Sequence, residues 1–266
     1  MAPYTLQLDE SEINRYRMIA GRAREREQTW WTAAGVAPGA KVADVGCGPG
    51  AVLAVLAEIV GPSGSVVGVD ADPGAVATAR QTIELAGLSN ASVVQAGATD
   101  TGLEPGSLDV AMMRLVLAHN GGIEQRIVNH LAELVRPGGV VYLVDVDLTG
   151  IRVFPPPSDD WSDMAARYIN YHRSLGNDPQ IGLRLQHLLQ GAGLEPLRFE
   201  GVIHVVRPPK GAGGPAWAAR AAMLAAGFID QADVERWKAA IERQDAAPEA
   251  PLMFAPNFVA FARRPS

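Results

Sequence analysis

The chain has 266 residues, of which 48% are hydrophobic, and its formal net charge is −6. This length suits one domain with additional covering segments, and an acidic chain without a run of Lys or Arg disfavours nucleic acid and anionic membrane surfaces as main partners. The single cysteine, Cys47, excludes an internal disulfide and fits a reducing compartment. Without a signal peptide or an apolar run of membrane-spanning length, the sequence predicts a cytoplasmic protein that acts away from membranes.

The N-terminal segment has the pattern of one long helix. Over residues 9–34, Ile13, Tyr16 and Ile19 lie near one face of such a helix. Trp30 and Trp31 close the segment, and large aromatic side chains of this kind mostly serve burial. We therefore expect this helix to pack on the body of the domain.

A glycine-rich loop follows the first expected strand. Residues 42–45 form an apolar run that contains one acid, Asp44, and the next five residues include Gly46, Gly48 and Gly50. Apolar helix-forming residues follow at once, so the order predicts a buried strand, a tight turn and a helix N-terminus. Glycines accept positive φ and let a ligand approach the backbone, and the free N–H groups of the helix then face that ligand.

An acidic residue ends the second expected strand. The run 65–69 is apolar and stops at Asp70, about 20 residues beyond the glycine loop, where doubly wound nucleotide-binding folds place the acid that binds a ribose hydroxyl. Asp72 followed by Pro73 is the pattern of a helix cap and first turn. The first 35 residues of the core thus predict a nucleoside-type ligand.

The rest of the chain alternates between strand and helix patterns. Further strands are expected at 91–95, 108–113, 140–146, 197–206 and 257–263, and helices at 50–59, 72–86, 123–135 and 180–192. This alternation predicts an α/β fold with a Rossmann-like, doubly wound sheet of seven strands, mostly parallel, with helices on both faces.

Three motifs together resemble those of the class I S-adenosylmethionine-dependent methyltransferases of small-molecule type. They are the loop Asp44-x-Gly46-x-Gly48-x-Gly50, the second strand ending in Asp70, and the turn Arg136-Pro137-Gly138-Gly139. The resemblance extends from about residue 10 to the C-terminus. It implies that the last two strands form an antiparallel hairpin and that S-adenosyl-L-methionine is the cofactor.

The resemblance also implies the cofactor-binding residues. They are Asp44, Gly46, Cys47, Gly48, Gly50, Asp70, Ala71, Ala98, Thr99, Arg114 and Tyr16. Asp44 has two compatible roles, a structural hydrogen bond to the loop and orientation of the cofactor's ammonium group. The family's acid for the adenine amino group is missing at 97–98, so Ala98 and Thr99 or, alternatively, Asp100 would contact the adenine.

Two histidines are candidates for the reaction itself. His119 follows the fourth strand, and in the resembled enzymes this position faces the reaction chamber. His172 lies in an aromatic-rich later segment. A hydroxyl or ammonium acceptor needs a place for its proton, and an imidazole suits neutral pH. His119 is either that base or a structural histidine bonded to its loop. The sequence shows no ligand spacing for zinc and no Asp-Asn partner for Asp145 or Asp147, so no metal is expected.

The chain is expected to be a single methyltransferase domain over 1–266. Within it, 1–35 form an N-terminal helical cover and 36–150 the cofactor-binding core. Residues 179–207 and 251–266 complete that core. Two insertions, 151–178 and 208–250, are expected to act as lids that select the substrate.

The sequence predicts an S-adenosylmethionine-dependent methyltransferase that acts on a small molecule, of natural-product or secondary-metabolite type, by in-line transfer to O, N or C. One alternative is an NAD(P)-dependent oxidoreductase, because Gly46-x-Gly48-x-x-Ala51 also fits the dinucleotide fingerprint. Another is a protein that binds the cofactor without methyl transfer, such as a cyclase. The sequence assigns no oligomeric state.

Overall fold

The computed structural model describes residues 10–208, 210 and 213–266, and the side chains of its first helix from Gly21 onward except Arg22. The helices are α1 (Glu10–Ala33), α2 (Ala51–Val60), α3 (Pro73–Leu85), η1 (Leu117–His119), α4 (Glu124–Leu134), η2 (Leu148–Gly150), α5 (Asp159–Ser174), η3 (Ile181–Arg184), α6 (Leu185–Gly191), α7 (Gly214–Ala218), α8 (Arg220–Ala225) and α9 (Gln231–Asp245). The strands are β1 (Lys41–Val45), β2 (Ser65–Asp70), β3 (Ala91–Gln95), β4 (Leu108–Arg114), β5 (Val135–Val146), β6 (Arg152–Phe154), β7 (Glu195–Val206) and β8 (Leu252–Arg263).

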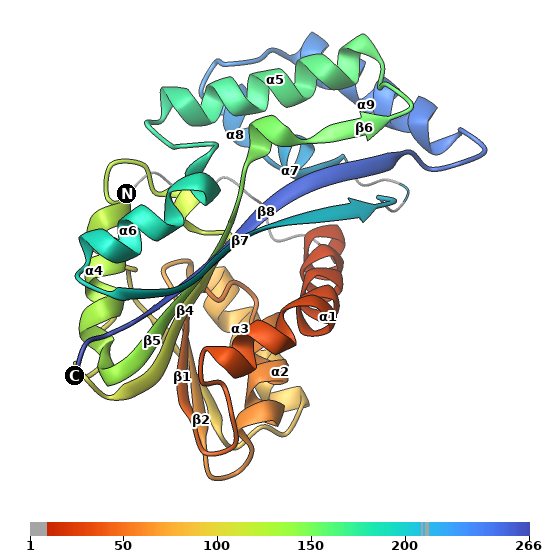
Figure 1. The fold of residues 1–266 in the computed structure, drawn as a ribbon. Helices are drawn as coiled ribbons and strands as arrows, with labels where there is room; N and C mark the ends of the chain where they lie inside the picture. Colours follow the sequence, from red (N-terminus) through yellow and green to blue (C-terminus); the bar gives the residue numbers. More distant parts are fainter. Residues whose placement is uncertain (1–9, 209, 211–212) are drawn as a thin grey trace.

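The strands form one mixed sheet of eight strands in the order β3-β2-β1-β4-β5-β8-β6, with β7 on the other edge of β8 (Figure 1). Strands β1 to β5 run parallel, and β8 runs antiparallel to β5, β6 and β7. The predicted Rossmann-like sheet with its C-terminal antiparallel hairpin is confirmed. The expected count of seven strands was one too low, because β6 is a strand of three residues inside the segment 151–178.

Helices cover both faces of the parallel sheet (Figure 1). On one face, Leu53 and Leu56 of α2 are fully buried with Trp31 of α1 in one apolar cluster. On the other face, Ile127 and Leu131 of α4 are fully buried in a second cluster with residues of α6. Each such side chain contributes roughly 1.5–3 kcal/mol by leaving water. This burial fixes the sheet whose strand ends carry the site.

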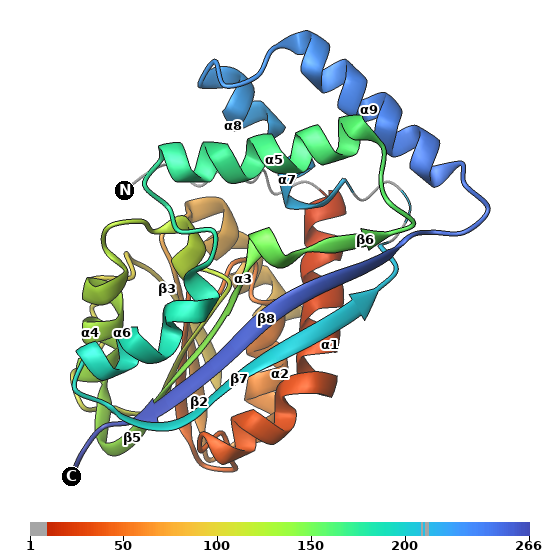
Figure 2. The same ribbon diagram turned by 45° about the horizontal axis from the view of Figure 1, so that its top comes forward.

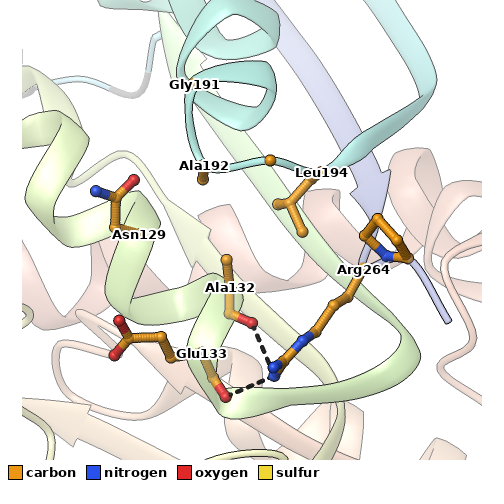
Figure 3. Close-up of a pocket in the computed structure, with 9 residues that line it drawn as sticks. Asn129, Ala132, Glu133, Gly191, Ala192, Leu194 and Arg264 are labelled. Atoms are coloured by element: carbon orange, nitrogen blue, oxygen red, sulfur yellow. Dashed lines mark hydrogen bonds between the residues drawn. The ribbon is translucent and has the colours of Figure 1, made fainter.

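The turn 136–139 lies within β5 and is closed by the end of the chain. Nη1 of Arg264 donates to the carbonyl oxygens of Ala132 at 3.4 Å and Glu133 at 3.1 Å (Figure 3). It also donates to the carbonyl oxygen of Val135 at 2.7 Å. A cation placed there pairs with carbonyls that the last turn of α4 leaves without helical partners. The shallow hollow beside Arg264 lies at the start of β5, whereas the glycine loop lies at the opposite, C-terminal ends of the parallel strands.

A smaller helical layer lies beyond the C-terminal ends of the strands (Figure 2). Trp237 of α9 is fully buried in a separate apolar cluster with residues of α5, α7 and α8. Arg236 bonds Asp160 at 2.9 Å and Asp163 at 3.2 Å, so ion pairs also join α9 to α5. The two segments expected as insertions therefore pack on each other. No helix in the described part of the chain combines the length and apolarity needed to cross a bilayer.

Candidate functional site

A cavity of about 580 Å³ opens at the C-terminal edge of the parallel strands, the edge at which open α/β sheets bind ligands. Its wall includes the loops after β1, β2, β3, β4 and β5 together with α5. This volume is in the range of pockets that bind cofactor-sized molecules.

The glycine loop forms one side of the cavity. Gly46, Gly48 and Gly50 have φ of 80°, 54° and 79°, a region that residues with a Cβ rarely adopt. A Cβ on Gly46 would lie 2.4 Å from Cγ2 of Val116, in the loop after β4. The glycines thus allow both the turn and its close contact with the neighbouring loop.

The carboxylate of Asp70 is held in place by two backbone groups. Its Oδ2 accepts a hydrogen bond from Gly48 N at 2.8 Å, and its Oδ1 accepts one from Asp72 N at 3.0 Å. Asp72 caps α3, as predicted, by accepting from Ala75 N at 2.7 Å. Each Asp70 oxygen keeps a lone pair for a further donor, so the group is fixed at the cavity wall and can still bind a diol.

Asp44 lies below the glycine loop and is 3% exposed. Burial raises the pKa of Asp44 to about 7, and the nearby Arg114 cation opposes that rise. A carboxylate in this position is costly until a cation faces it. The geometry fits the predicted contact with an ammonium group.

A buried ion pair that the sequence analysis did not foresee lies beside Asp44. Arg114 contacts Glu27 of α1 through Nη2 at 2.5 Å and Nε at 3.0 Å, and Tyr142 donates its hydroxyl to Glu27 at 3.0 Å. The Glu27 carboxylate raises the pKa of Arg114. This bidentate pair joins α1 to the central sheet next to the cavity.

The two predicted histidines meet in the cavity. The rings of His119 and His172 lie 4.9 Å apart, edge to face, and Tyr168 contacts His172 at 4.5 Å. The 151–178 segment thus brings His172 to the loop after β4. The sequence alone does not show that these two histidines are close in space.

Asn177 determines which nitrogen of His172 carries the proton. Gly121 N donates to Asn177 Oδ1 at 2.9 Å, which leaves Asn177 Nδ2 as the donor to His172 Nδ1, also at 2.9 Å. Neutral His172 is therefore protonated on Nε2. Burial lowers the pKa of His172 to about 4, so the ring is neutral at pH 7. Its Nε2 is buried and has no hydrogen-bond partner among the described residues.

The loop that carries His119 is anchored from below. Asp145 is 1% exposed and accepts from Ala118 N at 3.2 Å and Val146 N at 2.9 Å. Burial raises the pKa of Asp145 to about 7. In the same loop Leu115 has φ of 59°, an unusual value for a residue with a branched side chain. Such strain gathers where a site needs an imposed backbone geometry.

Most of the predicted cofactor residues line the cavity. These are Asp44, Gly46, Cys47, Gly48, Asp70, Ala71, Ala98 and Arg114. Gly50 and Thr99 are not among the lining residues, Gly50 acting as the N-cap of α2. The side chain of Tyr16 lies outside the described residues. Cys47 is buried, which raises the pKa of its thiol and fits the role of a small loop residue.

Comparison with known proteins identifies the core. A family model described as a methyltransferase domain matches residues 42–139, from β1 into β5. Residues 42–139 therefore belong to a methyltransferase domain. The predicted family is thereby confirmed, and S-adenosylmethionine is the cofactor that this methyltransferase domain implies. Within the described part of the chain, no three His, Cys, Asp or Glu side chains are grouped to hold a metal ion.

Named proteins of similar sequence match only part of this chain, and solved structures resemble its fold. Nocamycin O-methyltransferase of Saccharothrix syringae is 40% identical over 126 residues, which are 47% of this chain and 42% of that protein. The chain thus spans about two fifths of the curated relatives that it matches.

Solved structures resemble nearly the whole chain in fold. A Bacillus halodurans protein described as a candidate methyltransferase has a TM-score of 0.62 at 18% identity and covers 91% of this chain and 100% of its own. The 4+2 cyclase SpnF has a TM-score of 0.58 at 19% identity, covering 94% and 80%. At such identities the likeness shows the fold alone.

Proposed function

We propose that this protein transfers the methyl group of S-adenosylmethionine to an oxygen atom of a small organic molecule of the natural-product class. The observation that carries the proposal is the cavity itself, which joins the glycine loop and Asp70 to His119 and His172. The partial match to nocamycin O-methyltransferase supports an acceptor of this kind.

The residues of the cavity fit the cofactor at both ends. Asp70 presents two carboxylate oxygens to a ribose, and the buried Asp44 suits an ammonium group. The glycine loop leaves room for the chain that joins these two parts. When bound, the cofactor would supply an electrophilic methyl group.

His172 favours oxygen over nitrogen as the accepting atom. Its buried Nε2–H needs an acceptor, because an unpaired donor costs about 1–3 kcal/mol. A hydroxyl oxygen has two lone pairs, so it can accept that hydrogen bond with one and attack the methyl carbon with the other. A neutral amine has a single lone pair and cannot do both.

His119 is the proposed proton acceptor. The imidazole of His119 would take up the proton that a hydroxyl acceptor gives up when it is methylated. Asp145 holds the loop that carries this ring. His119→Ala is expected to bind cofactor normally and to lose roughly 10²–10⁴ in kcat, as for a general base. A loss below about tenfold would leave positioning as the mechanism.

His172→Phe tests the hydrogen-bond donor separately. The variant keeps an aromatic ring beside Tyr168 but lacks the N–H, so kcat/KM for an oxygen acceptor should fall about 2- to 15-fold. The pH–rate profile should keep its shape. An unchanged kcat/KM in a folded variant would remove the argument for oxygen.

The activity itself is tested with methyl-labelled S-adenosylmethionine and a panel of hydroxylated small molecules. Label should enter an acceptor, with a mass gain of one methylene. In calorimetry, Asp70→Ala should weaken S-adenosylhomocysteine about 10- to 100-fold, since hydrogen bonds to a charged group contribute about 1.5–3 kcal/mol. Glu84→Ala is the control, because Glu84 of α3 is an exposed acid that does not line the cavity. Cofactor binding without label transfer would favour an enzyme of another reaction type.

A further inference from the structure

The outer part of the sheet is an antiparallel ribbon with an apolar face. From Arg198 onward alternate residues of β7 point to one side of the strand, and Phe199, Ile203 and Val205 on that side are 38%, 58% and 57% exposed. Leu197, at an irregularity in the pairing of β7 with β8, is 43% exposed. Gly201 lies between Phe199 and Ile203 on the same side of the strand. In Figure 2 no helix is drawn in front of the outer halves of β7 and β8. We call Phe199, Gly201, Ile203 and Val205 the β7 stripe.

The β7 stripe continues across the ribbon onto its neighbours. The ring of Phe199 stacks on Phe258 of β8 at 5.9 Å, and Phe154 of β6 is 70% exposed. Single exposed apolar residues are ordinary, but a row of them along one strand marks an interaction surface.

The backbone of β7 is open as well. Within the described residues β7 pairs with β8 alone, over eleven register positions, and its other edge has no strand partner. A long apolar edge with unpaired N–H and C=O groups is a template for another strand. An exposed apolar face and an unpaired backbone edge thus lie on the same strand.

The sequence of β7 is complementary to itself. We propose that the protein forms a twofold homodimer by antiparallel pairing of β7 with β7 of a second copy, centred on Gly201. The pairing uses the regular part of β7 that follows the irregularity at Leu197, so residues 198–204 of the two copies lie opposite each other. In that register Phe199 faces Ile203 on both sides of the axis, and two apolar side chains of the stripe meet at each place.

The residue at the symmetry axis supports this register. In a twofold pairing the same residue of both copies faces itself at the centre, and Gly201 places no side chains there. Pro196, which lacks an N–H, precedes the irregularity at Leu197 and lies outside the paired residues. The result joins two eight-stranded sheets edge to edge.

Sedimentation velocity tests the dimer. The wild type should sediment as a dimer at micromolar concentration, and Ile203→Lys as a monomer, because a lysine on an edge strand opposes strand pairing and replaces the apolar contact with Phe199 of the second copy. Leu85→Lys is the matched control, since Leu85 of α3 is 80% exposed and lies outside the stripe. It should stay dimeric. A monomeric wild type, or equal behaviour of the two variants, would overturn the proposal.

Disulfide cross-linking tests the register. Facing residues at the axis have Cα atoms about 4.5–5.5 Å apart, so Gly201→Cys should form a covalent dimer under mild oxidation. The added Cβ would lie 3.3 Å from Cε1 of Phe258, a ring edge that can yield. In Ile203→Cys the two sulfur-bearing residues are about 13 Å apart along the strands and should stay reduced. The opposite result would contradict this pairing. Native Cys47 is buried and leaves the readout unaffected.

Discussion

Glu27→Gln should destabilise the protein strongly although it changes one carboxylate into an amide of the same shape. The side chains of Glu27 and Arg114 are 9% and 8% exposed, so loss of the charge leaves a buried guanidinium without its counter-ion. Breaking such a pair costs about 3–5 kcal/mol. For a chain of this size that corresponds to a fall in Tm of about 6–20 °C.

A second ion pair that involves α1 is the control. Arg24 and Glu58 lie 2.7 Å apart, but their side chains are 47% and 57% exposed. Arg24→Gln should therefore cost less than about 1 kcal/mol. Thermal unfolding by circular dichroism compares the two variants. If Glu27→Gln lowers Tm no more than Arg24→Gln does, burial does not set the strength of the pair and the reasoning fails.

Three further outcomes are expected. Asp44→Asn should flatten the pH dependence of stability. The wild-type contribution from protonated Asp44 is full below about pH 4 and is lost as pH rises through its folded pKa of about 7, which melting curves of both proteins would show. Gly46→Ala should unfold or abolish cofactor binding, whereas Gly87→Ala, with φ of 64° and open space, should cost only about 1–2 kcal/mol in denaturant titrations. Hydrogen exchange in α5 should slow when S-adenosylhomocysteine binds; protection limited to the glycine loop would make the 151–178 segment purely structural.

The parts predicted correctly from sequence rest on local signals. The glycine turn, Asp70 at the end of β2 and the Asp72 cap each depend on residues within a few positions of one another. The backbone conformation that each feature requires depends on neighbouring residues, so composition and spacing are enough to predict these features.

The parts that the sequence analysis missed depend on distant contacts. Glu27 and Arg114 are 87 positions apart, and nothing near either residue indicates the other. The bond from Asn177 to His172 is short in sequence, but its meaning depends on Gly121 N, 56 positions away. Strand β6 has three residues, too few to show a period of two.

The position of Cys47 allows its thiol to report on opening of the glycine loop. A Cβ on Gly68 would lie 2.8 Å from Sγ of Cys47, so the thiol is packed against β2, and its burial keeps it in the unreactive protonated form. A thiol reagent can then modify the native protein only while the loop is transiently open. The rate of labelling at this single cysteine therefore counts loop openings, and slowing of that rate by a nucleoside ligand would report occupancy without any engineered probe.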